Sequence, residues 1–189
     1  MEKFGKGWLL IIFLFIFGCK NSDIISPDSD LYDNYTEQTD NISKDVRKKI
    51  KYLNIHCTAS TGELTKSWLL NFFYKTRKWS KPGYNYVIHM DGKIDTLVYV
   101  DNDDYITYKE LSYGVVGVNA ESINIAYTGG VDSKLKSKDT RTIAQKKAIA
   151  QIVSILRKRY PNIIVLGHRD HPNVKKACPS FNVRAEFPP

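Results

Sequence analysis

Short apolar runs alternate along the chain with segments in which apolar residues recur every three or four positions. A short run bounded by turn residues predicts a strand, and the longer period predicts a helix with one buried face. The expected strands span residues 51–57, 84–90, 93–98, 122–127 and 163–166. The expected helices span residues 65–78, 139 or 140 to about 160, and 180–186. Strands that alternate with helices predict a single α/β domain with a mixed central β-sheet and helices packed on its faces.

Two of these segments carry specific local signals. The strands at residues 84–90 and 93–98 flank Asp91-Gly92, a pair that favours a tight hairpin turn. The helix at residues 65–78 has one apolar face, formed by Trp68, Leu69, Phe72 and Phe73. We expect this face to belong to the core rather than to a ligand platform. Residues 101–110 are polar and expected to be irregular.

The first part of the chain resembles an export signal. Lys3 and Lys6 precede an unbroken run of ten apolar residues (8–17), which suits a signal peptide and is too short to span a bilayer. Gly18-Cys19 closes the run as in a bacterial lipobox, where the cysteine is lipidated and becomes the new N-terminus. Phe17 is unusual in that motif, so an ordinary cleaved signal and an uncleaved anchor are the alternatives. We divide the chain into a lipoprotein-type signal peptide (1–18), a lipid-anchored disordered tether (19–45) and a folded domain (46–189).

Charge is divided unevenly between the tether and the domain. Residues 20–45 hold two lysines, seven acidic residues and few apolar ones, so they cannot bury enough surface to fold alone. From Arg47 onward, 24 Lys and Arg stand against 12 Asp and Glu, a formal charge of +12. A basic body favours an anionic partner such as an envelope polymer, a membrane surface or nucleic acid. The plainer alternative is a solvated surface with surplus lysine.

Two histidines and a cysteine stand where a metal site is expected. His56 ends the strand at residues 51–57, and His168 follows the strand at residues 163–166, at the strand ends where such sheets place their sites. Cys178 lies ten residues after His168, in a loop with two prolines. Imidazole and thiolate are usual zinc ligands, and three protein ligands with an open fourth position describe a catalytic zinc. His56, His168 and Cys178 are therefore candidate ligands for Zn²⁺.

Other histidine and cysteine side chains have plainer interpretations. Cys57 faces the opposite side of its strand from His56, so we expect it in the packing. An exported protein also permits a Cys57–Cys178 disulfide, which is the alternative. His171 is a competing ligand in principle, but we expect a loop or substrate-facing residue. We expect His89, near the hairpin turn, on the surface.

Five motifs in order resemble one known family. They are Ile55-His56-Cys57-Thr58, Gly83-Tyr84-Asn85-Tyr86-Val87-Ile88 with Asp91-Gly92, Asn119 with Ser122-Ile123, Gly167-His168-Arg169-Asp170, and Lys176-Ala177-Cys178-Pro179-Ser180-Phe181. Each motif is weak alone. Together, over residues 51–187, they resemble the type 2 N-acetylmuramoyl-L-alanine amidases, the family of phage amidase lysozymes and peptidoglycan recognition proteins. The last motif is especially similar to the phage lysozymes.

The resemblance implies an enzyme that cuts peptidoglycan. It implies zinc held by His56, His168 and Cys178, with Tyr84 and Lys176 assisting catalysis. The implied reaction is hydrolysis of the amide between the lactyl group of N-acetylmuramic acid and the L-alanine of the stem peptide. Zinc activates water and polarises the scissile carbonyl, while Lys176 and Tyr84 are suited to donate hydrogen bonds to the oxyanion that forms. No carboxylate stands out as a base, so the route of the proton stays open.

The chain departs from the family at two positions. Many members carry a His-Ala pair where this chain reads Gly114-Val115, and Asn85 stands where relatives often have histidine. We expect these changes to reshape the substrate groove or to alter the proton relay. Neither change removes a candidate zinc ligand.

The leading hypothesis is therefore a hydrolase of the bacterial cell envelope. We expect a monomeric zinc amidase, anchored to the membrane through a lipidated Cys19, that acts on peptidoglycan or muropeptides in cell-wall catabolism. The alternative is a non-catalytic peptidoglycan-binding lipoprotein on the same fold; relatives that only bind typically lose a zinc ligand, which favours catalysis here. The export signal disfavours a nucleic-acid-binding protein and an intracellular recycling amidase. The sequence leaves open the stem-peptide preference and which membrane holds the anchor.

Overall fold

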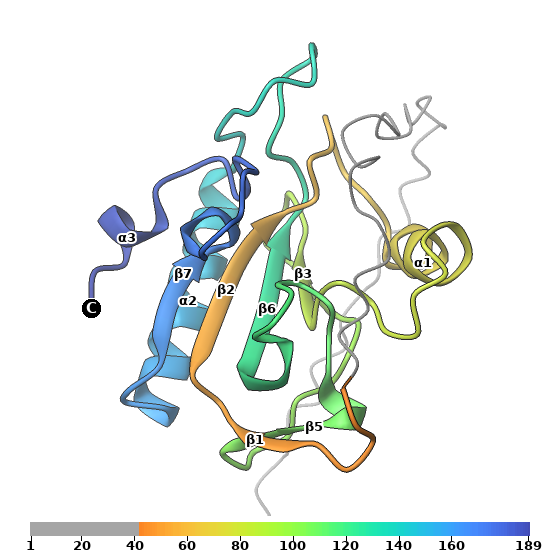
Figure 1. The fold of residues 1–189 in the computed structure, drawn as a ribbon. Helices are drawn as coiled ribbons and strands as arrows, with labels where there is room; N and C mark the ends of the chain where they lie inside the picture. Colours follow the sequence, from red (N-terminus) through yellow and green to blue (C-terminus); the bar gives the residue numbers. More distant parts are fainter. Residues whose placement is uncertain (1–41) are drawn as a thin grey trace, which may run out of the picture.

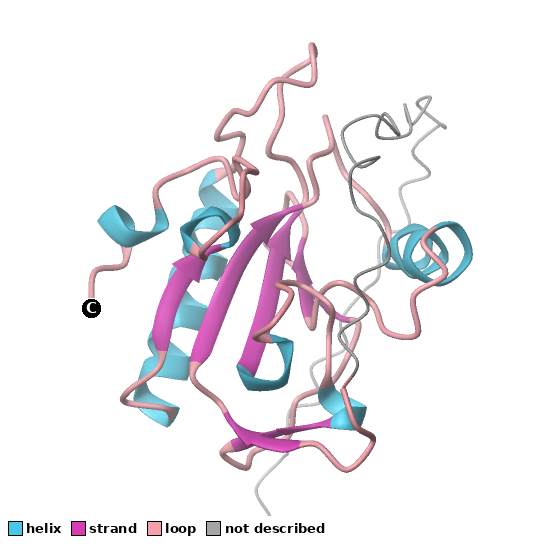
Figure 2. Cartoon of the chain, in the orientation of Figure 1, coloured by secondary structure: helices cyan, strands magenta, loops and turns pink. Residues whose placement is uncertain are grey.

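A mixed five-stranded sheet forms the centre of the computed structural model, which describes residues 42–189 (Figures 1 and 2). The strands are β2 (Tyr52–Cys57), β3 (Tyr86–Ile88), β4 (Ile94–Thr96), β6 (Ser122–Tyr127) and β7 (Ile164–Gly167). Their order in the sheet is β4-β3-β6-β2-β7. Neighbouring strands are parallel except for β4, which pairs antiparallel with β3. The predicted α/β class and mixed sheet are confirmed. The predicted signal peptide and most of the predicted tether lie outside the described residues.

The two faces of the sheet differ in chemistry. Helix α2 (Ile143–Arg159) lies behind the sheet in the view of Figure 1. Side chains alternate between faces along a strand, and the apolar set joins the helix in the main core, which includes Leu53, Ile55, Ile123, Ile125, Ile149 and Val153. Asn54, His56 and Asn124 occupy the intervening positions of β2 and β6, so they point to the opposite face. That face carries the candidate site.

Helix α2 begins later than the sequence predicts, at Ile143 rather than at residue 139 or 140. Thr142 is the N-cap, because its hydroxyl accepts a hydrogen bond from the Gln145 backbone N–H (3.0 Å). The Gln145 side chain in turn accepts from the Thr142 N–H (3.0 Å), so the pair satisfies two N–H groups that the helix leaves unbonded. Asp139, one of the two predicted caps, instead accepts from the buried guanidinium of Arg141 (2.9 Å).

The predicted helix at residues 65–78 is shorter and changes its winding. Helix α1 (Lys66–Asn71) continues as a π-helical segment (Phe72–Thr76). The apolar face has two rows of side chains, and only the row formed by Leu69 and Phe73 is fully buried. Leu69 and Phe73 are buried in a cluster with Leu64 and Val87. Trp68 and Phe72 pack against the same cluster but are only partly buried. All four side chains of this helical face line a cavity. The expectation that the whole face is core was wrong for Trp68 and Phe72.

The predicted hairpin is confirmed, with β3 and β4 joined by a turn in which Gly92 has a φ of +86°. The polar segment 101–110 is more regular than expected, because β5 (Tyr105–Thr107) pairs antiparallel with β1 (Arg47–Lys49). Strand β1 is exposed throughout, so it has no apolar pattern to reveal it. The closing helix α3 covers only Val183–Glu186, and short 3-10 turns occur at Tyr108–Glu110, Asn119–Glu121 and His168–Asp170. Within residues 42–189, none of the helices has the length and apolar character needed to cross a membrane.

Candidate metal centre and substrate cavity

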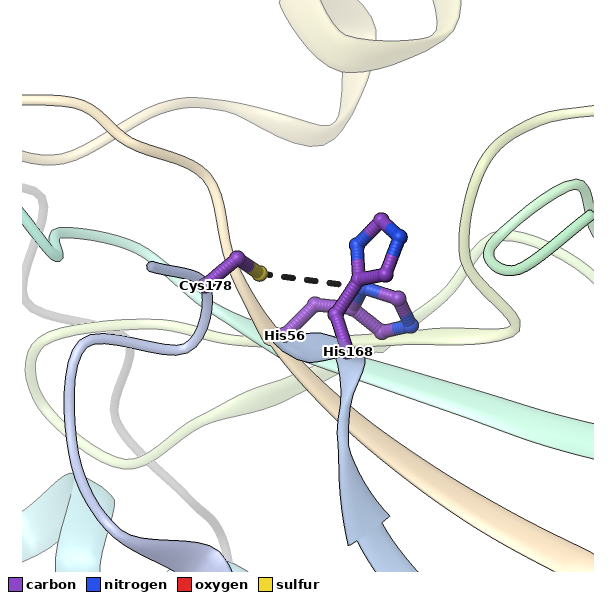
Figure 3. Close-up of side chains that lie close together, drawn as sticks. All are labelled: His56, His168 and Cys178. Atoms are coloured by element: carbon purple, nitrogen blue, oxygen red, sulfur yellow. Dashed lines mark hydrogen bonds between the residues drawn. The ribbon is translucent and has the colours of Figure 1, made fainter. Parts of the chain in front are cut away.

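His56, His168 and Cys178 come together from three separate segments (Figure 3). His56 lies near the carboxyl end of β2, and His168 directly follows β7. Because β2 and β7 are parallel neighbours, these ends meet at one edge of the sheet, and the two imidazole centroids lie 4.8 Å apart. The Nδ1 atom of His56 lies 3.8 Å from Cys178 Sγ, and the candidate ligand atoms of the three residues all lie within 4.8 Å of one another.

The loop that carries Cys178 is fixed against the end of β6. The Tyr127 hydroxyl donates to the carbonyl of Pro179 (2.6 Å), and the Ser180 hydroxyl donates to the carbonyl of Gly130 (2.7 Å). These bonds hold Pro179 and Ser180, the two residues after Cys178, against the end of β6 and the loop that follows it. The thiol is therefore positioned by the sheet although it lies in a loop.

The three donors fit a zinc ion. With Zn–N about 2.05 Å and Zn–S about 2.3 Å, a tetrahedral site separates nitrogen from sulfur by about 3.6 Å, close to the observed 3.8 Å between His56 and Cys178. Burial holds the pKa of His56 well below its usual value and lowers the pKa of His168 to about 3, so both imidazoles are neutral at pH 7. Burial raises the pKa of the Cys178 thiol, so metal binding must displace its proton. Which residues bind zinc stays a prediction.

Cys57 is buried in the main core, as predicted. Its backbone N–H donates to Cys178 Sγ (3.3 Å), and both residues are free cysteines. The structure therefore has no disulfide between Cys57 and Cys178, which was the alternative interpretation. The N–H bond gives a Cys178 thiolate one partner in addition to a metal.

A cavity of about 360 Å³ opens beside the three candidate ligands. Its wall includes aromatic side chains from the helical segment, the loop after it and the loop after β5: Trp68, Phe72, Phe73, Trp79, Tyr84 and Tyr113. Arg77, Lys175 and Lys176 add positive charge. The cavity thus joins apolar rings and basic groups beside the histidine and cysteine donors, which suits a ligand with both apolar and anionic parts.

Tyr84 and Lys176, the predicted catalytic pair, both line this cavity. The Tyr84 ring centroid lies 5.3 Å from that of His56, and its hydroxyl donates to the Cys57 carbonyl (3.4 Å). Burial lowers the pKa of Lys176, while the nearby Cys178 opposes that shift. All five predicted site residues therefore gather in one place, although their catalytic roles stay predictions.

The structure tests the expectations for the other two histidines. His171 lies in a loop, as one of its two predicted alternatives has it. It is buried, and its Nε2 pairs with Asn54 Oδ1 (2.8 Å) behind the site. His89, expected on the surface, is only partly exposed: 12% of its side chain is accessible. Its Nδ1 lies 2.6 Å from Glu63 Oε1 and its Nε2 lies 3.0 Å from Asp95 Oδ2. These two carboxylates clamp the ring and link the segment after β2 to the hairpin.

Sequence reasoning missed the polar layer beneath His56. Asn124 Oδ1 lies 3.2 Å from His56 Nε2, and Asn54 Nδ2 donates to the same oxygen (3.0 Å). The available signal was an asparagine in the middle of each of two otherwise apolar strands. A fully buried polar side chain requires a partner, so this pattern pointed to a shared network between neighbouring strands.

Fold and site together define a single α/β domain with two histidines and one cysteine, suited to a metal, beside a cavity at the strand ends. Residues 46–181 match the family model described as N-acetylmuramoyl-L-alanine amidase. The chain belongs to this family, the type 2 amidases that the sequence motifs resemble.

Similar proteins agree with this assignment. The chain is 26% identical over 139 residues to the endolysin of Enterobacteria phage K11, which covers 73% of this chain and 85% of that protein. Its fold is similar to that of the Ph2119 endolysin from the Thermus scotoductus MAT2119 bacteriophage Ph2119 (TM-score 0.55, 23% identity, 72% of this chain and 84% of that one). It is also similar to that of Drosophila PGRP-LB (TM-score 0.54, 18% identity, 74% and 79%). Family membership supports an amidase that acts on peptidoglycan.

Proposed function

We propose that this protein is a zinc-dependent N-acetylmuramoyl-L-alanine amidase. It hydrolyses the amide between the lactyl group of N-acetylmuramic acid and the L-alanine of the stem peptide in bacterial peptidoglycan. The observation that carries this proposal is the convergence of His56, His168 and Cys178 on a cavity that also contains Tyr84 and Lys176. When bound, zinc supplies Lewis-acid polarisation of the scissile carbonyl and activation of water.

Lys176 and Tyr84 stabilise the charge that develops on the carbonyl oxygen. Amide hydrolysis places negative charge on that oxygen, and preorganised donors in a partly buried cavity lower the barrier to its formation. Lys176 supplies an ammonium donor two residues before Cys178. The Tyr84 hydroxyl bonds to the Cys57 carbonyl at 3.4 Å, which is long for an O–H···O bond.

The cavity wall accounts for binding of the stem peptide. Trp68 and Phe72 stack with 9° between their planes and present partly exposed rings for apolar contact. Arg77 and Lys175 stand at the same wall and attract the carboxylates of an anionic peptide. Recognition and chemistry thus use different side chains of one cavity.

The test is hydrolysis of purified peptidoglycan by the purified protein, with metal content measured in parallel. Mass spectrometry should detect free stem peptides that begin with L-alanine, lost on chelation and restored by zinc. Lys176→Ala should retain zinc but lose about 10²- to 10³-fold in turnover, the cost of removing one oxyanion donor. Lys147→Ala, which changes an exposed lysine of helix α2 that does not line the cavity, is the control and should retain most activity.

Two outcomes would change the conclusion. Zinc bound without cleavage of sacculi or muropeptides would favour the non-catalytic peptidoglycan-binding alternative. A protein that binds no zinc, or a Cys178→Ala variant that binds zinc as tightly as the unaltered chain, would remove the metal assignment itself.

The proposal extends to location. The apolar run at residues 8–17 followed by Gly18-Cys19, and the polar acidic segment after it, support a domain tethered to the bacterial envelope by a lipidated cysteine. Cys19→Ser should abolish incorporation of labelled fatty acid and move the protein from the membrane fraction to the soluble fraction. Unchanged fractionation and an unlabelled parent protein would contradict the anchor without affecting the amidase.

A further inference from the structure

We infer that Asn124 is a positioning residue that holds His56 as its Nε2-protonated tautomer and so keeps Nδ1 available for a metal. The inference rests on the proposed metal centre. The two nitrogens of the His56 ring face different partners. Nδ1 points toward Cys178 Sγ, at 3.8 Å (Figure 3), and Nε2 points away from the cavity toward Asn124 Oδ1, at 3.2 Å. His56 and Asn124 are both fully buried, so water does not compete for the contact between Nε2 and Asn124 Oδ1.

Two backbone groups fix the direction of every hydrogen bond in this layer. The Glu110 carbonyl accepts from Asn85 Nδ2 (2.8 Å), so Asn85 Oδ1 faces the other way. That oxygen accepts from the backbone N–H of Asn124 (2.9 Å) and from the Ser112 hydroxyl (2.7 Å). Because the Ser112 proton is used there, its oxygen accepts from Asn124 Nδ2 (2.9 Å). Asn124 Oδ1 is therefore left as an acceptor facing His56.

The consequence for His56 is a choice between its two neutral tautomers. An acceptor at 3.2 Å requires an N–H on Nε2, since two facing lone pairs would repel in a buried site. The neutral imidazole carries one proton, so Nδ1 keeps its lone pair. Asn54 reinforces the arrangement, because its Nδ2 also donates to Asn124 Oδ1 (3.0 Å) while its Oδ1 pairs with His171 Nε2 (2.8 Å). Within residues 42–189, every buried polar side-chain atom has a partner.

The same layer accounts for both departures of this chain from its family. Asn85 supplies the oxygen that sets the direction of the chain of bonds. A Cβ atom at position 114 would lie 2.3 Å from Asn124 Oδ1, so only glycine leaves room for the Asn124 amide there. Asn85, Asn124 and Gly114 thus belong to one structural device behind His56. Gly114 also lines the cavity, so the change at this position contributes to the cavity wall as well.

The experiment reads the tautomer directly in the metal-free full-length protein. The chain has four histidines, so selective ¹⁵N-histidine labelling gives a spectrum simple enough to assign. Long-range ¹H–¹⁵N correlations above the ordinary histidine pKa should show His56 protonated at Nε2 alone. Asn124→Ala should give a mixture of tautomers, and zinc affinity, measured by competition with a chromogenic chelator, should fall about 10- to 100-fold.

The controls separate positioning from general damage. Gln145→Ala removes an equally buried amide that lies outside this layer and bonds to the carbonyls of Ile88 and Thr128. It should leave the His56 tautomer and zinc affinity close to those of the parent. Asn124→Asp keeps the oxygen acceptor and should retain the Nε2 proton, which tests the idea if Asn124→Ala fails to fold.

Two results would overturn the inference. One is an Nδ1-protonated His56 in the parent protein, and the other is an unchanged tautomer with unchanged zinc affinity in Asn124→Ala. These readouts do not use peptidoglycan cleavage. A protein that passes both tests but does not cut peptidoglycan would refute the proposed activity and leave the role of Asn124 intact.

Discussion

Gly114→Ala adds a single methyl group at the most crowded point of the polar layer. The new Cβ atom would lie 2.3 Å from Asn124 Oδ1, 2.4 Å from Cγ and 2.9 Å from Nδ2. Comfortable contacts between such atoms are about 3.5 Å or longer. Asn124 must therefore move, and its side chain gives up hydrogen bonds to His56, Asn54 and Ser112 when it does.

The expected loss of stability follows from these contacts. Overpacking of a filled interior costs about 1 to 3 kcal/mol, and each buried hydrogen bond that is lost costs about 1 kcal/mol net. Since part of the layer can shift together, we expect a fall of about 3 kcal/mol in the free energy of unfolding. For a domain of this size that corresponds to a drop of about 6 to 12 °C in Tm.

Thermal and urea unfolding of the metal-free protein measure this loss. Gly62→Ala is the matched control, because a Cβ atom at position 62 meets nothing within 4 Å, and its effect should stay within about 1 kcal/mol. The double variant Gly114→Ala/Asn124→Gly removes the obstructing amide, so it should be more stable than the sum of the single changes predicts, by about 2 kcal/mol. A Gly114→Ala protein as stable as the parent, or strict additivity in the double variant, would refute this account of the layer.

Three further predictions concern the metal and two ion pairs. Zinc at about 1,000 times its Kd should stabilise the chelated protein by about 4 kcal/mol, and Cys178→Ala should abolish most of that gain in a thermal-shift assay. Burial lowers the pKa of His89, but the bonds to Glu63 and Asp95 outweigh burial and leave the pKa of the folded state raised. Protonated His89 therefore stabilises the folded protein fully at pH values below the unfolded pKa of about 6.5. This contribution to the free energy of unfolding is lost as the pH rises through the folded pKa. His89→Gln should remove this pH-dependent part of the urea unfolding curves, and an unchanged pH profile would contradict the clamp. Arg141→Met removes a buried guanidinium that binds Glu186 (2.8 Å) and should cost about 2 to 3 kcal/mol in urea.

Strong local patterns allowed the centre of the fold to be predicted. Strands β2, β6 and β7 are short apolar runs between turns, and parallel pairing brings their carboxyl ends together. The sequence thus predicts His56 and His168 at strand ends, and the parallel pairing in the structure brings these ends to one edge of the sheet. Cys178 followed from its residue type and from the motif around it, because a loop has no periodicity that fixes its position.

Features that depend on tertiary contacts could not be predicted from the sequence patterns. Strand β1 is polar and exposed, and it is a strand only because β5 pairs with it. The spacing of Trp68 and Phe72 is typical of core residues. How deeply these two side chains are buried depends on the rotation of the helix against its neighbours, which the sequence pattern does not give. His89 illustrates the same limit, since Glu63 lies 26 residues away in sequence.

The two departures from the family are better understood together than separately. Taken singly, Asn85 and Gly114 look like the loss of polar groups near a substrate groove. In space, the Asn124 amide fills the volume beside Gly114, and a histidine at position 114 would collide with it through its Cβ atom alone. Asn85 is then needed, because its oxygen receives the Ser112 proton and so turns the Asn124 oxygen toward His56. Asn85 and Gly114 thus take part in a buried layer that contacts a candidate metal ligand from behind. Gly114→His should therefore damage the protein because its Cβ atom collides with Asn124, and Asn85→His should do so because it removes the oxygen that accepts the Ser112 proton.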